Sequence, residues 1–306
     1  MNQINVGTSA RKKKKVGSSQ ILLFAFYAIV IAFAIMCLYP LLLAIGVSLT
    51  DETFVIKNGY RVIPGEFSLA AYKIVLGSLG KNILNAYTVT IMVTVLGTLF
   101  SLLVSSAMAY VLSIKEFRPR GFLNLFLYIP MIFSAGLLPW YIMCTKYYHL
   151  TNRFYALILP ATLNVFNVFL LRNFFNSIPD EMAEAAKIDG AGYLKIFSII
   201  YLPLGKVGLV TVGMFYALSY WNDYYLALMF ITEQKLYPLQ YYLYNMLANV
   251  QFMATQANQS LGYNINVPLE TTKMATICIT IGPILLLYPF AQKYFTKGVI
   301  VGAVKG

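Results

Sequence analysis

Six long apolar stretches constrain this chain more than any other feature of its sequence. The first runs for 29 residues, from Ile21 to Leu49. A transmembrane α-helix needs about 20 consecutive apolar residues, and these stretches are too long and too uniformly apolar for half-exposed strands. The other five are Asn82–Leu112, Gly121–Thr145, Phe154–Phe174, Val207–Ile231 and Lys273–Tyr294. The sequence therefore predicts an all-α membrane protein with six transmembrane helices.

The composition excludes several other classes of protein. Hydrophobic residues make up 59% of the chain and charged residues only 11%, against about 25% charged in a typical soluble domain. This balance rules out an ordinary soluble enzyme and a disordered chain. The formal net charge of +12 would suggest a nucleic-acid partner in a soluble protein. In a membrane protein it indicates basic loops instead, so we expect no nucleic-acid partner.

The basic run at the N-terminus sets the expected orientation. Residues 11–15 are Arg-Lys-Lys-Lys-Lys, and the apolar stretch that follows is longer than the roughly 7–15 residues of a signal-peptide core. We therefore interpret residues 21–49 as a retained first transmembrane helix that follows a cytoplasmic segment. Six helices place both ends on one side of the membrane. On this arrangement the inner segments hold 15 Lys and Arg and the outer segments hold 8, which favours cytoplasmic termini.

Small residues and prolines indicate how the helices pack. Gly97, Ser101, Ser105 and Ala109 recur every four residues in the second stretch. Such a pattern lets another helix approach closely, although small residues are common in any membrane helix. Prolines also interrupt the fourth and sixth stretches, where kinks are expected because each proline removes a backbone donor. These prolines are Pro160, Pro283 and Pro289.

The longest inner loop, Arg172 to Lys206, carries a predicted helix of about three turns. Pro179 suits a helix start, and acidic residues follow it, where the helix dipole favours negative charge. Gly190 is a natural stop. The alanines leave one face small, and a small face can fit a groove on another protein. A second segment, Tyr193–Tyr201, has apolar residues at helical spacing and is expected to end at Leu202-Pro203.

The spacing within this loop is specific. Glu184-Ala185-Ala186 is followed after three residues by Gly190, and then after nine residues by Ile200 and, one residue later, Leu202-Pro203. The chain resembles the importer permeases of the ATP-binding-cassette class, in which this loop forms coupling helices that fit a cleft on the ATPase subunit. The resemblance implies an ATPase-coupling role for Glu184, Ala185, Ala186, Asp189, Gly190, Ile200, Leu202 and Pro203.

The resemblance extends over nearly the whole chain. Trp221-Asn222-Asp223 and the ending Gly302–Gly306 look like the carbohydrate-uptake branch, similar to the maltose-type second permease subunit, whose tail reaches toward the ATPase interface. This implies that Lys305 and Gly306 lie at that interface. The run Ser48–Glu52, with Asn58-Gly59-Tyr60 after it, looks like permeases for complex oligosaccharides.

The resemblance also implies a division of the chain and a set of partners. The divisions are a basic cytoplasmic N-terminus (1–20), a first transmembrane helix (21–49), an extracytoplasmic loop (50–81), the importer core (82–296) and a cytoplasmic tail (297–306). The expected partners are a second homologous permease, two ATPase subunits or domains, an extracytoplasmic solute-binding protein, a carbohydrate substrate and membrane lipid. ATP and magnesium would bind the ATPase, and no cofactor is expected in this chain. The expected location is a bacterial plasma membrane.

Candidate substrate contacts follow from the chemistry of a sugar, which presents hydroxyls and weakly apolar ring faces. Asp223 is the one carboxylate well inside an apolar stretch, which suggests a pathway residue; an interfacial aromatic belt beside Trp221 and Asn222 is the alternative. Asn164 and Asn167, three residues apart, either line a cavity or bond a neighbouring helix. Within the outer loop 232–272, the stretch Tyr237–Tyr263 is rich in tyrosine and asparagine. It contacts either a binding protein or the sugar, or its tyrosines have no specific role, as is common near a membrane face.

No enzymatic motif is present in the sequence. The chain lacks the GxxxxGK[ST], HExxH and GxSxG patterns, so we predict neither catalytic residues nor a metal site, and the energy must come from a separate subunit. The hypothesis is a permease subunit of an ATP-driven importer for oligosaccharide. The alternatives are an ion-gradient-driven sugar transporter, which usually needs intramembrane carboxylates or repeats, and a non-transporting membrane assembly subunit.

Overall fold

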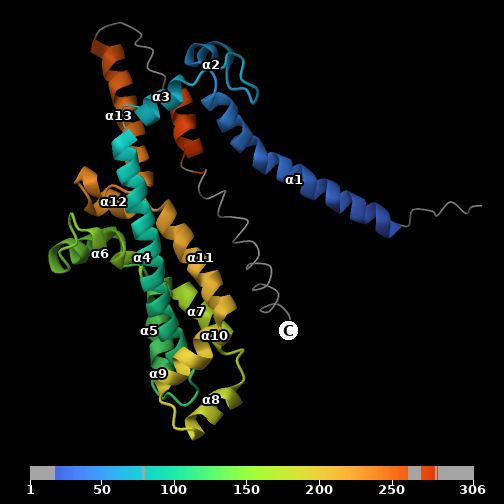
Figure 1. Ribbon diagram of the computed structural model, residues 1–306, viewed down its shortest axis with the longest axis vertical. Coiled ribbons are helices and arrows are strands. Elements are labelled where there is room, and N and C mark those ends of the chain that lie inside the picture. The colour runs from blue at the N-terminus through green and yellow to red at the C-terminus, as the bar shows by residue number, and fades with distance from the viewer. Residues whose placement is uncertain (1–17, 78–79, 261–269, 280, 282–306) are drawn as a thin grey trace, which may run out of the picture.

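The computed structural model describes residues 18–77, 80–260, 270–279 and 281. Within these residues the chain is built from helices and turns, and its β-structure is a single bridge between Thr50 and Phe67. The all-α prediction is confirmed to this extent. Figure 1 shows the long helix α4 (Gly80–Ser113) running along the molecule, with α3 and α13 near one end and α8 and α9 near the other.

Helix α4 is the centre of the bundle. Its main neighbours are α11 (Lys206–Asn222) and α7 (Val165–Phe175). The residues of its small-residue pattern face α11: the Ser101 hydroxyl lies 2.9 Å from the Tyr220 hydroxyl, and the Ser105 hydroxyl lies 2.7 Å from that of Tyr216. A Cβ added at Gly97 would lie 2.8 Å from the Tyr220 ring. The small residues do make a close contact with α11, but tyrosine rings fill the space, so the predicted close approach of a second backbone is not what these residues provide.

Several predicted membrane spans are bent rather than continuous. Two helices are long and apolar enough to cross a membrane, and up to five spans result if each bent pair is one span, counted over the described residues only. The predicted span Gly121–Thr145 is divided into α5 (Arg120–Ile132) and α6 (Leu137–Ile142), which continues into η1 (Met143–Tyr147); the break bends by 114°. Gly136, at φ 85°, permits this turn.

The fourth predicted span also bends, close to its proline. The short helices η2 (Phe154–Leu157) and η3 (Leu159–Ala161) precede α7 at an angle of 58°. Pro160 lies within η3, so the expected kink is confirmed there. Pro283 and Pro289, and most of the predicted sixth span, lie outside the described residues.

The predicted fifth span, Val207–Ile231, is not one helix. Helix α11 ends at Asn222, and α12 (Tyr225–Phe230) is a separate short helix. Asp223 between them is extended, at φ −75° and ψ 122°, and its carboxylate accepts hydrogen bonds from the backbone N–H groups of Tyr225 and Leu226 at 3.2 and 3.3 Å. A side chain that satisfies the first amides of a new helix favours a break at that point.

The segment predicted as an outer loop at 232–272 contains a long helix instead. After the short helix η5 (Gln234–Leu236), helix α13 (Leu239–Ser260) occupies 22 residues of it. Its apolar face packs on α3 (Ala70–Gly77) and the start of α4, through buried Leu239, Tyr242 and Leu243. Its glutamines and asparagines lower the hydropathy of the segment, which explains why the sequence predicts a loop.

Helix α2 (Glu52–Asn58) contacts the start of the helix at 270–279. The Glu52 carboxylate is buried, accepts the backbone N–H groups of Glu270 and Thr271 at 2.9 Å each, and accepts the Thr271 hydroxyl at 2.6 Å. Three hydrogen bonds to one carboxylate fix the start of the last described helix against α2.

Helix α1 (Ser18–Ser48) extends away from the bundle (Figure 1). Only 6% of its apolar window is buried inside the molecule. The predicted first transmembrane helix is therefore present as a helix, and its side chains are left for lipid or another subunit.

Candidate functional site

The helix predicted between the fourth and fifth spans is α8 (Asp180–Ile188). Pro179 occupies its N-cap position, and Asp180 and Glu181 lie in the first turn, where negative charge is favourable. At its C-terminus Gly190 takes φ 81°. The N–H of Ala191 donates to the carbonyl of Ala186 at 2.9 Å and that of Gly190 to Lys187 at 3.0 Å, which is the Schellman motif.

The outer surface of α8 is exposed and partly apolar. Ile188 is 87% exposed, and Leu194, just after the turn, is 83% exposed. Met182, Glu184 and Ala185 are also exposed, while Ala183 and Ala186 pack against the core. Glu184 forms no hydrogen bond or ion pair with the described residues. We call the exposed set Met182, Glu184, Ala185, Ile188 and Leu194 the α8 face.

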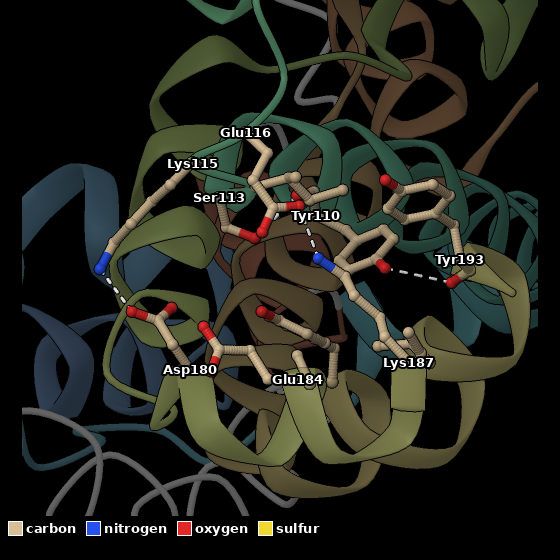
Figure 2. Close-up of a pocket in the computed structure, with 12 residues that line it drawn as sticks. Tyr110, Ser113, Lys115, Glu116, Asp180, Glu184, Lys187 and Tyr193 are labelled. Atoms are coloured by element: carbon tan, nitrogen blue, oxygen red, sulfur yellow. Dashed lines mark hydrogen bonds and ion pairs between the residues drawn. The ribbon is translucent and has the colours of Figure 1, made fainter. Parts of the chain in front are cut away.

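Two ion pairs connect α8 to the end of α4 (Figure 2). Lys115 bonds Asp180, and the Lys187 ammonium lies 2.5 Å from a Glu116 carboxylate oxygen. The hydrogen bond to Glu116 holds the pKa of Lys187 above its usual value. Adjacent residues after α4 thus contact two positions on α8 that are seven residues, or about two turns, apart, which fixes how α8 is oriented.

The second predicted segment is also helical, and it connects α8 to the bundle. It comprises α9 (Tyr193–Ile196), the π-helical turn η4 (Phe197–Tyr201) and α10 (Leu202–Leu204), and it meets α11 at 81°. It runs through the predicted end at Leu202-Pro203 as far as Leu204. The Tyr110 hydroxyl of α4 donates to the Tyr193 carbonyl at 3.1 Å, and Ile200 packs against the core.

The turn into α11 is tightly packed. A Cβ at Gly205 would lie 2.4 Å from the Phe175 ring, so no larger residue fits there without displacement. Of the predicted coupling residues, Glu184, Ala185, Asp189 and Gly190 are exposed on or beside α8, whereas Ile200 is half-buried at the junction with the bundle. The structure therefore divides the motif into an outward-facing part and a part that anchors it.

A second candidate region is an open cavity of about 780 Å³ at the break between α5 and α6. Asp223 lines it together with Trp140, Tyr220 and Tyr225. Trp140 and Tyr225 are stacked, with ring centroids 6.4 Å apart. A carboxylate beside aromatic rings is suited to the hydroxyls and ring faces of a sugar.

The other predicted pathway residues do not line this cavity. Trp221 is buried, and the Asn222 side chain donates to the Leu218 carbonyl at 2.9 Å. Asn164 is the N-cap of α7 and accepts the backbone N–H of buried Asn167 at 3.2 Å. The two asparagines are therefore a helix cap and its partner rather than two residues of one helix face.

Some residues of these regions were missed from the sequence. Lys115 and Glu116 follow an apolar helix directly, and their opposite charges were the available signal. Trp140 is one of only two tryptophans, but nothing local connects it to Asp223. Lys305 and Gly306 lie outside the described residues. No group of three or more potential metal ligands occurs in the part of the chain that the structure describes.

Membrane-length helices, an exposed capped helix at one end of the bundle and an open cavity at the break between α5 and α6 are features of a membrane transport component. Residues 118–301 match the family described as "Binding-protein-dependent transport system inner membrane component". The chain belongs to this family and is a permease of the carbohydrate ABC transporter class. It is a component of the bacterial plasma membrane and not an enzyme, and its family implies ATPase and binding-protein partners.

Individual proteins similar to this chain are named as transporters of oligosaccharides and polysaccharides. The polygalacturonan/rhamnogalacturonan transport system permease protein YtcP of Bacillus subtilis is 36% identical over 92% of this chain and 96% of its own length. The arabinooligosaccharides transport system permease protein AraQ of Halalkalibacterium halodurans is 30% identical over 92% of this chain and 94% of its own. A crystal structure of a bacterial ABC transporter involved in the import of the acidic polysaccharide alginate superposes with a TM-score of 0.78, at 29% identity, covering 95% of this chain and 100% of that one.

Proposed function

We propose that this chain forms half of the translocation pathway of an ATP-driven oligosaccharide importer. A second, homologous permease forms the other half, two ATPase subunits or domains bind ATP and magnesium, and an extracytoplasmic binding protein delivers the sugar. The names of the relatives support an oligosaccharide substrate, since they refer to polygalacturonan, arabinooligosaccharides and alginate.

The observation that carries this proposal is the geometry of α8. Its termini are fixed by Pro179 and by the Gly190 turn, its outer face is exposed, and two ion pairs connect it to α4. A short helix of this kind can bind a partner on one side and transmit movement to the bundle on the other. We place the α8 face in the cleft of the ATPase.

The mechanism follows from the connections of α4. Closure of the ATPases on ATP would move α8, and α8 would move α4 through Lys115 and Glu116. Helix α4 is bonded to α11 through Ser101 and Ser105, and α11 ends at the Asp223 cavity. The cavity would then open outward to receive sugar, and ATP hydrolysis would return it to the inward-facing state.

The cavity beside Asp223 is the proposed sugar contact of this subunit. Each Asp223 carboxylate oxygen accepts one backbone N–H at the start of α12, which holds the group in place and leaves a second lone pair on each oxygen to accept a sugar hydroxyl. The Trp140 ring provides an apolar platform for a face of the sugar ring. Both termini lie in the cytoplasm on this proposal, with Lys305 and Gly306 reaching the ATPase interface.

The test is affinity purification of the chain from mild detergent, with the associated proteins identified by mass. We expect an ATPase and a second permease to copurify. Glu184→Lys reverses the charge on the α8 face, and Gly190→Pro cannot adopt φ 81°, because proline is restricted to φ near −65°. Both variants should lose the ATPase and sugar uptake.

The matched control is Gly192→Ala, because Gly192 has φ −74° and open space around its Cβ position. This variant should keep the ATPase. If Glu184→Lys and Gly190→Pro import sugar normally, the coupling assignment is wrong. Purification of the chain alone, with sugar uptake into vesicles that contain no ATP, would instead establish a gradient-driven carrier.

A further inference from the structure

A groove between α5 and α7 lies apart from both regions described above. It has a volume of about 540 Å³. One wall is the first part of α5 and the other is the last part of α7. The lining residues are Asn124, Leu125, Tyr128, Phe169, Arg172 and Asn173. The lining contains both polar groups, Asn124, Arg172 and Asn173, and apolar or aromatic ones, Leu125, Tyr128 and Phe169, so it suits a ligand with a polar head and an apolar body.

The groove contains a positive charge without a counter-ion. One guanidinium nitrogen of Arg172 donates to the Asn124 side-chain oxygen at 3.0 Å, while its Nε is buried and has no hydrogen-bond partner. Arg120 is close enough to repel Arg172 electrostatically. Neither arginine forms an ion pair with any carboxylate of the described residues. A partly buried charge left unpaired is costly, so an anion would stabilise the site.

The position of the groove indicates which class of anion would bind there. Arg172 is in the last turn of α7, and Arg120 is the first residue of α5. Both are therefore at the ends of membrane-spanning segments, at the depth of lipid headgroups. An interfacial arginine usually extends its charge into water, whereas Asn124 holds Arg172 at the groove. Basic pockets between transmembrane helices are known binding sites for anionic headgroups.

We propose that this groove binds an anionic phospholipid. The phosphate contacts Arg172 and the amide of Asn173, and an acyl chain lies along Leu125, Tyr128 and Phe169. Asn173 precedes α8 by a few residues, so the lipid would lie beside the segment that leads into the coupling helix.

The experiment measures lipid bound to the purified importer complex. The complex is delipidated, incubated with vesicles of equal parts phosphatidylcholine and phosphatidylglycerol, and repurified, and its bound lipids are quantified by mass spectrometry. The wild type should retain phosphatidylglycerol preferentially. Asn173→Asp adds a carboxylate beside Arg172 with little change of shape, and it should lower that preference about fivefold.

The matched control is Asn176→Asp, which makes the same change at the exposed C-cap of α7, outside the groove. It should retain the wild-type preference. Arg172→Gln should lower the preference for phosphatidylglycerol as Asn173→Asp does. If Arg172→Gln fails to assemble, the result for Asn173→Asp alone tests the proposal. Equal retention in wild type and Asn173→Asp overturns the proposal. So does displacement of the lipid by a galacturonate oligosaccharide, because the groove would then belong to the sugar pathway. Lipid retention is measured without transport, so the result is independent of the proposed function.

Discussion

The ammonium of Lys187 on α8 lies 2.5 Å from the carboxylate of Glu116, which follows the long helix α4. This contact joins the exposed helix to the centre of the bundle. Because the two side chains are 34% and 62% exposed, the pair contributes little to stability, about 0–1 kcal/mol. Its main consequence is therefore the orientation of α8.

We expect Glu116→Lys to lower the number of sugar molecules imported per ATP hydrolysed, because like charges would push α8 away from α4. Lys187→Glu should have the same effect. The double variant Glu116→Lys/Lys187→Glu restores opposite charges and should recover most of the coupling. The assay is ATP consumption and sugar uptake in the same proteoliposomes. Reversal of Lys235, which pairs with Glu233 far from α8, serves as the control, and a double variant no better than either single variant would refute the role of the pair.

A second prediction concerns the glycine that ends α8. Gly190→Ala must hold an alanine, which has a Cβ atom, at φ 81°. This left-handed conformation costs a non-glycine residue about 1–2 kcal/mol. We expect weaker binding of the ATPase, by about five- to thirtyfold, if this strain unwinds the end of the helix. Titration of purified ATPase onto the permease in detergent measures it. Gly192→Ala should bind as wild type does, and equal affinity in both variants would show that the turn does not affect docking.

Asp223 has two separable properties, its charge and its hydrogen bonds to α12. Asp223→Asn keeps a good helix-capping group, so the fold should be retained while the charge is lost. We expect a changed concentration dependence of sugar uptake without loss of assembly. Asp223→Ala should additionally lower stability by about 1 kcal/mol. If Asp223→Asn shows the same concentration dependence of sugar uptake as the wild type, the charge of Asp223 does not contact the sugar and the residue has only a structural role.

The contact between α4 and α11 should be sensitive to volume. Gly97→Ala places a Cβ 2.8 Å from the Tyr220 ring, so the helices must separate slightly, at a cost of about 1–3 kcal/mol. Thermal unfolding of the purified complex should show a lower midpoint. Gly121→Ala is the control, since nothing lies within 4 Å of its Cβ position. An unchanged midpoint for Gly97→Ala would mean that α11 is not held closely in the membrane.

The Glu52 carboxylate should stabilise the start of the helix at 270–279 through its three hydrogen bonds to Glu270 and Thr271. Glu52→Gln loses the charge that strengthens these bonds and keeps only one acceptor oxygen, so its amide NH2 would face a donor whose hydrogen bond Glu52 now accepts. We expect faster proteolysis at the start of the helix at 270–279, measured by mass spectrometry of the fragments. Glu66→Gln, an exposed carboxylate in the same region, should leave the cleavage rate unchanged, and equal rates in the two variants would contradict the capping role.

Hydropathy and local signals predicted the long apolar helices, α8 and the bend near Pro160, but not the other breaks between helices. Apolar composition shows that a segment can lie in a membrane, and it does not show where the chain turns. The bend at Gly136 depends on a positive φ, and the end of α11 depends on hydrogen bonds made by Asp223. The sequence predicts a loop at α13 because the glutamines and asparagines of this segment lower its hydropathy. The contacts of Lys115 and Glu116 with α8 join residues about 70 apart in sequence, which no local pattern can show.

The hydroxyl contacts between α4 and α11 limit how these helices can slide. Serines recur every four residues on α4 and tyrosines every four on α11, and the two helices now pair Ser101 with Tyr220 and Ser105 with Tyr216. A shift by a full turn, about 5.4 Å, would bring Ser105 opposite Tyr220 and keep one pair. A half-turn shift would separate both pairs and remove the tyrosine partners of Ser101 and Ser105, and it would also disturb the bonds of Tyr220 to the Ile158 carbonyl and of Tyr216 to the Asn164 N–H. The two helices thus have discrete registers. They either move together as one rigid body, or α11 shifts along α4 by one whole turn from one register to the next.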